Sequence, residues 1–186
     1  MLEIGPDDES VLRNLPPIYV DVLLRLPEIL RDDQADVRER LFPMAYPGDA
    51  DKEAEWSRYA RPDLEVLFED RIATMQKDLQ HRLTFELATE EGVGPVPFGF
   101  CLTIPAAHRT AWIAGLNAAR LALAVRHGVE AEDMDPWQES GESSEAGEPT
   151  DKDLAILQIE LLGHLQGMLL REVEPDVGDD GVSDSA

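Results

Sequence analysis

Hydrophobic residues recur at helical spacing along most of the chain. The longest stripe starts after Pro62 and continues for about five turns, with apolar residues three and four positions apart. Its members are Leu64, Leu67, Phe68, Ile72, Met75, Leu79 and Leu83. Shorter stripes with proline or acidic openings predict helices within 6–15, 16–30 and 32–42, and again from Lys52. The pattern therefore predicts a mainly α protein.

The helix predicted over residues 105–127 carries an arginine beside its apolar face. A proline opens this segment, and Gly128 suits a left-handed stop. The apolar face comprises Trp112, Leu116, Ala119 and Leu123. Arg120 lies at the edge of that face, where its guanidinium keeps its charge and requires a polar partner. We expect a carboxylate, from Glu55 or Asp63, to be that partner. A ligand-binding pair of Arg120 with Asn117 is the less favoured alternative.

The last predicted helix, 151–173, is apolar on two opposite sides. One side comprises Leu154, Leu157, Leu161, Leu165 and Met168, and the other comprises Ile156, Ile159, Gly163, Gly167 and Leu170. Such a helix either lies in the centre of the core or is covered on its second face by a partner. The central position is favoured. The alternative is a partner surface formed by Ile156, Ile159, Gly163 and Gly167.

One short region has the composition of β structure. Residues 98–104 (FGFCLTI) are aromatic and β-branched, and residues 83–87 (LTFEL) supply an arm with which they can pair. The chain contains no internal repeat. We therefore expect a single-domain orthogonal helical bundle over residues 1–173, with at most one short β-hairpin near 84–104.

Acidic residues outnumber basic ones by 39 to 16, so the net charge is −23. Such a chain repels polyphosphate and anionic lipid at long range, which disfavours direct nucleic-acid binding and membrane docking. Acidic residues are dense in 130–150 and 174–186, and their composition cannot form a core. We expect a disordered loop and a disordered tail there, with Trp137 a docking point for a protein partner.

Several features predict a cytoplasmic protein. The first ten residues lack the charged and apolar regions of a signal peptide, and no stretch approaches the roughly 18 apolar residues of a membrane span. Cys101 is the only cysteine, so the chain has no internal disulfide. This cysteine lies in an apolar run, where a buried inert thiol is favoured over a redox role.

Candidate chemistry is sparse. Asp78 and His81 lie three positions apart on one side of the long helix, as one half of a helical di-iron site does. With Glu160 on the last helix, they are the residues that a metal-binding or enzymatic alternative would use. A second such pair is missing, and nucleophile-elbow, phosphate-loop and zinc motifs are absent. We therefore expect solvent-exposed side chains here, and no cofactor or metal.

Three blocks of sequence carry a family resemblance. They are RLFPMAYPGDADKEAEW (40–56), AWIAGLNAARLALAVRHGV (111–129) and DLAILQIELLGHLQGMLL (153–170). Together they resemble the bacterial, chiefly actinobacterial, domain of unknown function two-thousand-and-seventeen. The second block is the most specific, because it matches the family pattern at Trp112, Asn117, Arg120, Leu121, Ala122 and Leu123. Ala118 and Ala124 depart from the aspartate and glycine typical of that pattern.

The resemblance implies a mostly helical protein for which no catalytic residues are established. Some members of the family are described as oxidative-stress transcription regulators that act with a sigma factor. We therefore expect a non-enzymatic, cytoplasmic regulatory protein that acts through a protein partner, such as a transcription factor or sigma factor, without direct contact to nucleic acid. A homodimer stays open as one form of that partnership.

Overall fold

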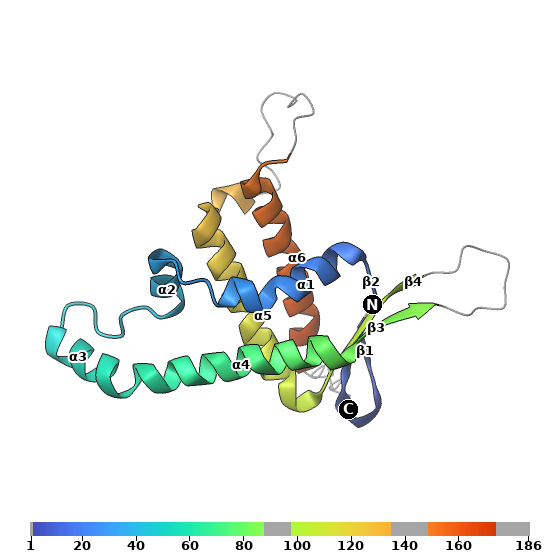
Figure 1. Ribbon diagram of the computed structural model, residues 1–186, viewed down its shortest axis with the longest axis horizontal. Helices are drawn as coiled ribbons and strands as arrows, with labels where there is room; N and C mark the ends of the chain where they lie inside the picture. The colour runs from blue at the N-terminus through green and yellow to red at the C-terminus, as the bar shows by residue number, and fades with distance from the viewer. Residues whose placement is uncertain (1, 88–97, 135–148, 174–186) are drawn as a thin grey trace, which may run out of the picture.

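A computed structural model describes residues 2–87, 98–134 and 149–173 of the chain (Figure 1). The helices in this part are α1 (Pro17–Leu30), α2 (Ala35–Leu41), α3 (Ala50–Tyr59), α4 (Arg61–Arg82), α5 (Arg109–His127) and α6 (Asp151–Val173). Its strands are β1 (Leu2–Ile4), β2 (Ser10–Leu15), β3 (Leu83–Leu87) and β4 (Phe98–Ile104). Short 3-10 helices are η1 (Pro6–Asp8), η2 (Ala106–His108) and η3 (Glu132–Met134).

The four strands form one antiparallel sheet in the order β1-β2-β4-β3. The predicted hairpin exists, since β3 pairs with β4 from Leu83 opposite Leu102 onward. The expectation of a helical bundle with at most one hairpin is nevertheless wrong, because β1 and β2 extend the sheet at the N-terminus. The helix predicted within 6–15 is also wrong, because this segment holds η1 and β2.

A β-bulge explains why β2 has the hydrophobic spacing of a helix. Leu12 pairs with Leu102 and Leu15 pairs with Phe100, with a register shift between these two pairs. The additional residue lets Leu12 and Leu15, three positions apart, both join the core cluster. Asn14 takes the left-handed conformation in the bulge, with φ of 55°. The Asn14 backbone lies so close to Gly99 that a Cβ atom at Gly99 would overlap the Asn14 backbone.

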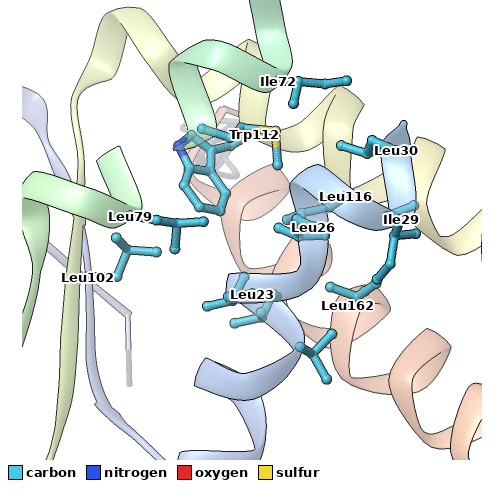
Figure 2. Close-up of a cluster of buried hydrophobic side chains, with 14 of the residues drawn as sticks. Leu23, Leu26, Ile29, Leu30, Ile72, Leu79, Leu102, Trp112, Leu116 and Leu162 are labelled. Atoms are coloured by element: carbon cyan, nitrogen blue, oxygen red, sulfur yellow. The ribbon is translucent and has the colours of Figure 1, made fainter. Parts of the chain in front are cut away.

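The main core lies where α1, α4, α5 and α6 meet one face of the sheet. Figure 2 shows Trp112 of α5 between α4 and α1, with Leu26 and Leu79 close by. Trp112 is fully buried, as are the other residues of the face predicted on α5. The left-handed Gly128 that ends α5 was also predicted correctly. The buried residues of α6 are Ala155, Ile159, Leu162, Leu165 and Leu169, and they repeat at helical spacing.

Helices α4 and α5 cross in close contact at Gly115. A Cβ atom at this position would overlap the sulfur of Met75, a side chain that is 1% exposed. The absence of a side chain at Gly115 therefore sets how closely these two helices approach. Strand β3 begins at Leu83, the residue directly after α4 ends at Arg82, so no loop separates helix from strand.

Only the C-terminal half of the longest hydrophobic stripe lies in the core. Ile72, Met75 and Leu79 of α4 are buried, whereas Leu64 and Leu67 are exposed. Helix α3 packs on this exposed end of α4. In Figure 1, α3 and the N-terminal end of α4 lie apart from α5 and α6. We call residues 42–70 the arm.

Part of the predicted acidic loop is ordered. Within 130–150, η3 forms and Asp133 pairs with Lys152 at 2.7 Å between oxygen and Nζ. The predicted start of the last helix at residue 151 is confirmed. A capping box forms there, because the backbone N–H of Thr150 donates to the Asp153 carboxylate at 2.9 Å and that of Asp153 donates to the Thr150 hydroxyl at 3.2 Å. The rest of the predicted loop, 135–148, and the predicted tail, 174–186, lie outside the described residues.

Candidate functional site

Asp78 of α4 places a carboxylate inside the core, where it is 1% exposed. The indole N–H of Trp112 donates to Oδ2 at 2.9 Å, and Nδ1 of His108 lies 3.0 and 2.9 Å from the two carboxylate oxygens. Arg82 adds a positive charge, with its Nε 3.7 Å from Oδ1. These partners compensate for taking the carboxylate out of water.

The Asp78–His108 pair has the form of the carboxylate–histidine pairs that orient an imidazole in hydrolases. Catalysis by such a pair also requires a nucleophile or substrate at the second ring nitrogen. In the part of the chain that the structure describes, no hydroxyl or thiol hydrogen-bonds to His108. The geometry therefore supports an anchoring role, in which Asp78 fastens α4 to the start of α5 through His108 and Trp112.

The expectation of solvent-exposed side chains is wrong for Asp78, and the Asp78–His81 pairing that the metal-binding alternative requires does not form. His81 is exposed on α4, and Glu160 is exposed on α6, while Asp78 faces the core. Among the described residues, no three His, Cys, Asp or Glu side chains gather closely enough to hold a metal ion. The sequence does contain a signal for the real partners, because His108 and Trp112 are four positions apart and share a helix face. It does not contain the information that this face meets α4.

Arg120 is held by an amide, so the expectation of a carboxylate from Glu55 or Asp63 is wrong. Its Nη1 donates to Oε1 of Gln166 on α6 at 2.8 Å, and the Gln166 amide donates to the carbonyl of Ile113 at 3.3 Å. The Nε atom of Arg120 is buried without a hydrogen-bond partner. The Arg120 guanidinium packs closely against Gly163, which has no side chain. A Cβ atom at Gly163 would lie only 3.3 Å from the central carbon of the guanidinium.

Trp112, Asn117 and Arg120, which match the family pattern, do not line a single pocket, so the alternative of a ligand-binding pair of Arg120 with Asn117 does not form. Trp112 faces Asp78 in the core, and Arg120 faces α6. Asn117 is exposed and lines a separate cleft of about 280 Å³ between α2, α4 and α5. The other residues lining this cleft are Arg40, Leu41, Phe68, Arg71, Ala114, Gly115, Ala118 and Leu121.

Most of the partner surface predicted on α6 is occupied within the protein. Ile159 is buried, Ile156 is half-buried, and Gly163 lies against the Arg120 guanidinium. Gly167 has open space beside it. The exposed apolar residues of the helix are instead Leu154, Leu157 and Leu170. Trp137, the other predicted docking point, lies outside the described residues.

The arm carries the densest group of exposed apolar side chains in the described part of the chain. These are Met44, Tyr46, Tyr59, Leu64, Val66 and Leu67, each 43–67% exposed. A hollow of about 240 Å³ adjoins them, lined by Leu41, Phe42, Pro43, Met44, Ala45, Trp56, Arg61 and Leu64. This surface was not predicted from the sequence, because the stripe on α4 has the same spacing whether it meets the core or water.

Internal contacts give the arm a defined shape. Glu65 accepts from Arg38 of α2 at 2.9 Å, and Arg61 donates to the carbonyl of Phe42 at 3.1 Å. Asp49 caps α3. The Lys52 side chain and, to a smaller extent, the Lys52 backbone N–H lower the pKa of the Asp49 carboxyl below its usual value. The exposed apolar side chains are therefore displayed on an ordered support.

Cys101 is 4% exposed on β4, so its thiol is shielded from solvent, as favoured from the sequence. None of the helices in the described residues combines the length and the hydropathy needed to cross a membrane.

Comparison with known proteins identifies one family. The sequence profile described as Domain of unknown function (DUF2017) matches residues 2–173, which include the sheet, the arm and all six helices described above. No curated protein matches the chain, and no solved structure does.

Proposed function

Because the chain belongs to the family described as Domain of unknown function (DUF2017), we propose its function from the surface that it displays. The protein is a non-enzymatic, cytoplasmic regulatory protein that acts by binding a protein partner through the arm. The observation that carries this proposal is the exposed apolar surface of residues 42–70. A group of exposed apolar side chains of this kind is typical of sites where proteins bind one another.

The distribution of exposed apolar residues supports the arm over other surfaces. Of the 13 large hydrophobic side chains that are exposed in the described residues, six belong to the arm. Val66 and Tyr59 are 60% and 67% exposed, although they lie on or beside ordered helices. Their exposure gains nothing for the stability of the monomer, whereas covering them with a partner buries apolar area.

The charge of the arm indicates the kind of partner. Residues 49–70 contain eight acidic and three basic residues. A partner that fits this surface presents apolar side chains surrounded by lysine or arginine, which match the acidic rim and speed the encounter. We propose a protein of the transcription machinery, either a sigma factor or a transcription factor, in line with the stress-linked regulation that the family resemblance implies. A chain of net charge −23 reaches DNA through such a protein rather than by itself.

Quantitative co-purification from the native cell tests this proposal. Leu64→Ser combined with Leu67→Ser removes exposed apolar area, so the fold should be retained while a basic transcription protein is lost from the eluate. The matched control is Leu24→Ser combined with Leu154→Ser, which removes two exposed leucines of α1 and α6. The control variant should retain the partner.

Two results would contradict the proposal. One is equal recovery of every co-purifying protein by the arm variant and the wild type. The other is tight, sequence-selective binding of the isolated protein to duplex DNA, measured by fluorescence anisotropy near physiological salt. We expect no measurable binding under these conditions, whereas even non-specific binders typically reach dissociation constants of roughly 10⁻⁴–10⁻⁶ M.

A further inference from the structure

The cleft lined by Arg40, Arg71 and Asn117 has a composition unlike the rest of this acidic protein. Two guanidinium groups and one amide lie at a hollow of about 280 Å³, and no acidic residue lines it. The two arginines come from α2 and α4, and the asparagine comes from α5. Three separate helices thus bring hydrogen-bond donors to one place.

Neither of these two arginines has an ion-pair or hydrogen-bond partner among the described residues. By contrast, Arg31 and Arg38, which precede Arg40 in the chain, pair with Glu69 and Glu65 at 3.0 and 2.9 Å. Acidic residues outnumber basic ones by 39 to 16, so a carboxylate partner is available to most arginines. Both guanidinium groups at this cleft therefore have donors available for an anion.

The remaining lining of the cleft is apolar. Leu41 and Phe68 contribute from α2 and α4, and Ala118 and Leu121 from α5. A guanidinium presents a planar fork of N–H donors that matches a carboxylate. The volume is close to the lower limit of small-molecule sites, about 300 Å³, and fits one small molecule rather than a protein surface.

We propose that this cleft binds a small organic monocarboxylate with an apolar body. The carboxylate accepts hydrogen bonds from Arg40 and Arg71, and the Asn117 side-chain amide donates a further one. The aliphatic or aromatic body of the ligand lies on Leu41, Phe68 and Leu121. Arg40, Arg71 and Asn117 all lie outside residues 42–70, so the proposal does not depend on the proposed function.

Isothermal titration of the full chain with octanoate tests the proposal, and octanamide serves as the matched neutral ligand. We expect saturable binding of octanoate with one site per chain, and no binding of octanamide at the same concentration. Arg40→Gln and Arg71→Gln should each weaken octanoate binding by about tenfold or more, the effect of losing one charge-assisted hydrogen bond. Both arginines are exposed, so these variants should keep the fold and the melting temperature of the wild type.

Two further variants separate the cleft from the overall charge. Arg58→Gln makes the same charge change on the arm, away from the cleft, and should bind octanoate as the wild type does. Asn117→Asp places a carboxylate at the cleft with little change in shape and should abolish binding. Absence of octanoate binding to the wild type would overturn the proposal, as would equal affinity in the Arg40, Arg71 and Arg58 variants.

Discussion

Asp78 anchors α4 to α5 through Trp112 and His108, and this role predicts strong energetic coupling between Asp78 and Trp112. Asp78→Leu leaves the fully buried indole N–H without an acceptor, which costs about 1–3 kcal/mol. Trp112→Phe removes a hydrogen bond to a buried charge, worth about 1.5–3 kcal/mol, and leaves a small cavity in addition. His108 contributes less, because its side chain is 33% exposed and can turn to water.

The double variant removes both polar groups, so no buried group is left without its partner. We therefore expect Asp78→Leu with Trp112→Phe to cost about 2 kcal/mol less than the sum of the two single variants. The measurement is urea unfolding followed by far-ultraviolet circular dichroism at pH 7. With a slope near 2 kcal/mol per molar urea, the costs of the single variants correspond to midpoint shifts of about 0.5–1.5 M.

The control is Trp56→Phe on the arm, which has no hydrogen bond to a buried carboxylate and should shift the midpoint far less. Additivity of the two core variants within about 0.5 kcal/mol would refute the argument, because independent sites behave in that way. It would show that the carboxylate and the indole do not depend on each other for the stability of the core.

Three smaller predictions test other contacts. Gly115→Ala should destabilise by about 1–3 kcal/mol in urea unfolding, and Met75→Ala in the same chain should recover part of the loss, whereas a neutral Gly115→Ala would contradict the close crossing. Arg120→Met should change the free energy of unfolding by no more than about 1 kcal/mol, because the variant loses one hydrogen bond but no longer buries an unpaired Nε. A loss of about 3 kcal/mol would indicate a charged partner and contradict this prediction. The Thr150 side chain and, to a smaller extent, its backbone N–H lower the pKa of Asp153 below its usual value. Their contact therefore stabilises the folded state at pH values above the unfolded-state pKa, and this stabilisation is lost as the pH falls through the folded-state pKa. Thr150→Ala should therefore lower the melting temperature more at neutral pH than in acid, where only the bond from the Asp153 backbone N–H to the Thr150 hydroxyl remains to be lost. An equal effect at both pH values would contradict this assignment.

Local signals in the sequence were sufficient for most of the helices. The stop at Gly128, the start of the last helix at residue 151 and the stripe through Ile72 and Leu79 each depend on residues within a few turns of one another. Each was therefore readable before the structure was known. The hairpin of β3 and β4 was also predicted, because its two arms share aromatic and β-branched composition.

The errors arose where distant segments decide the outcome. The bulge in β2 puts Leu12 and Leu15 three residues apart on one face, and only pairing with β4 distinguishes that spacing from a helix. The partner of Arg120 is an uncharged amide on α6, a choice that depends on how two helices cross. The exposure of Leu64 and Leu67 likewise depends on where the body of the protein ends, which periodicity does not encode.

The direct passage from α4 into β3 has a mechanical consequence. A helix of 22 residues is about 33 Å long, and here it joins the displayed arm to the edge of the sheet with no hinge residue between them. Near its C-terminal end, Asp78 fixes the helix to Trp112 and His108. A force applied to the arm therefore rotates the whole helix about this contact. If a partner bound to the arm tilts α4, the tilt also moves β3 at the edge of the sheet, because no loop separates the helix from the strand.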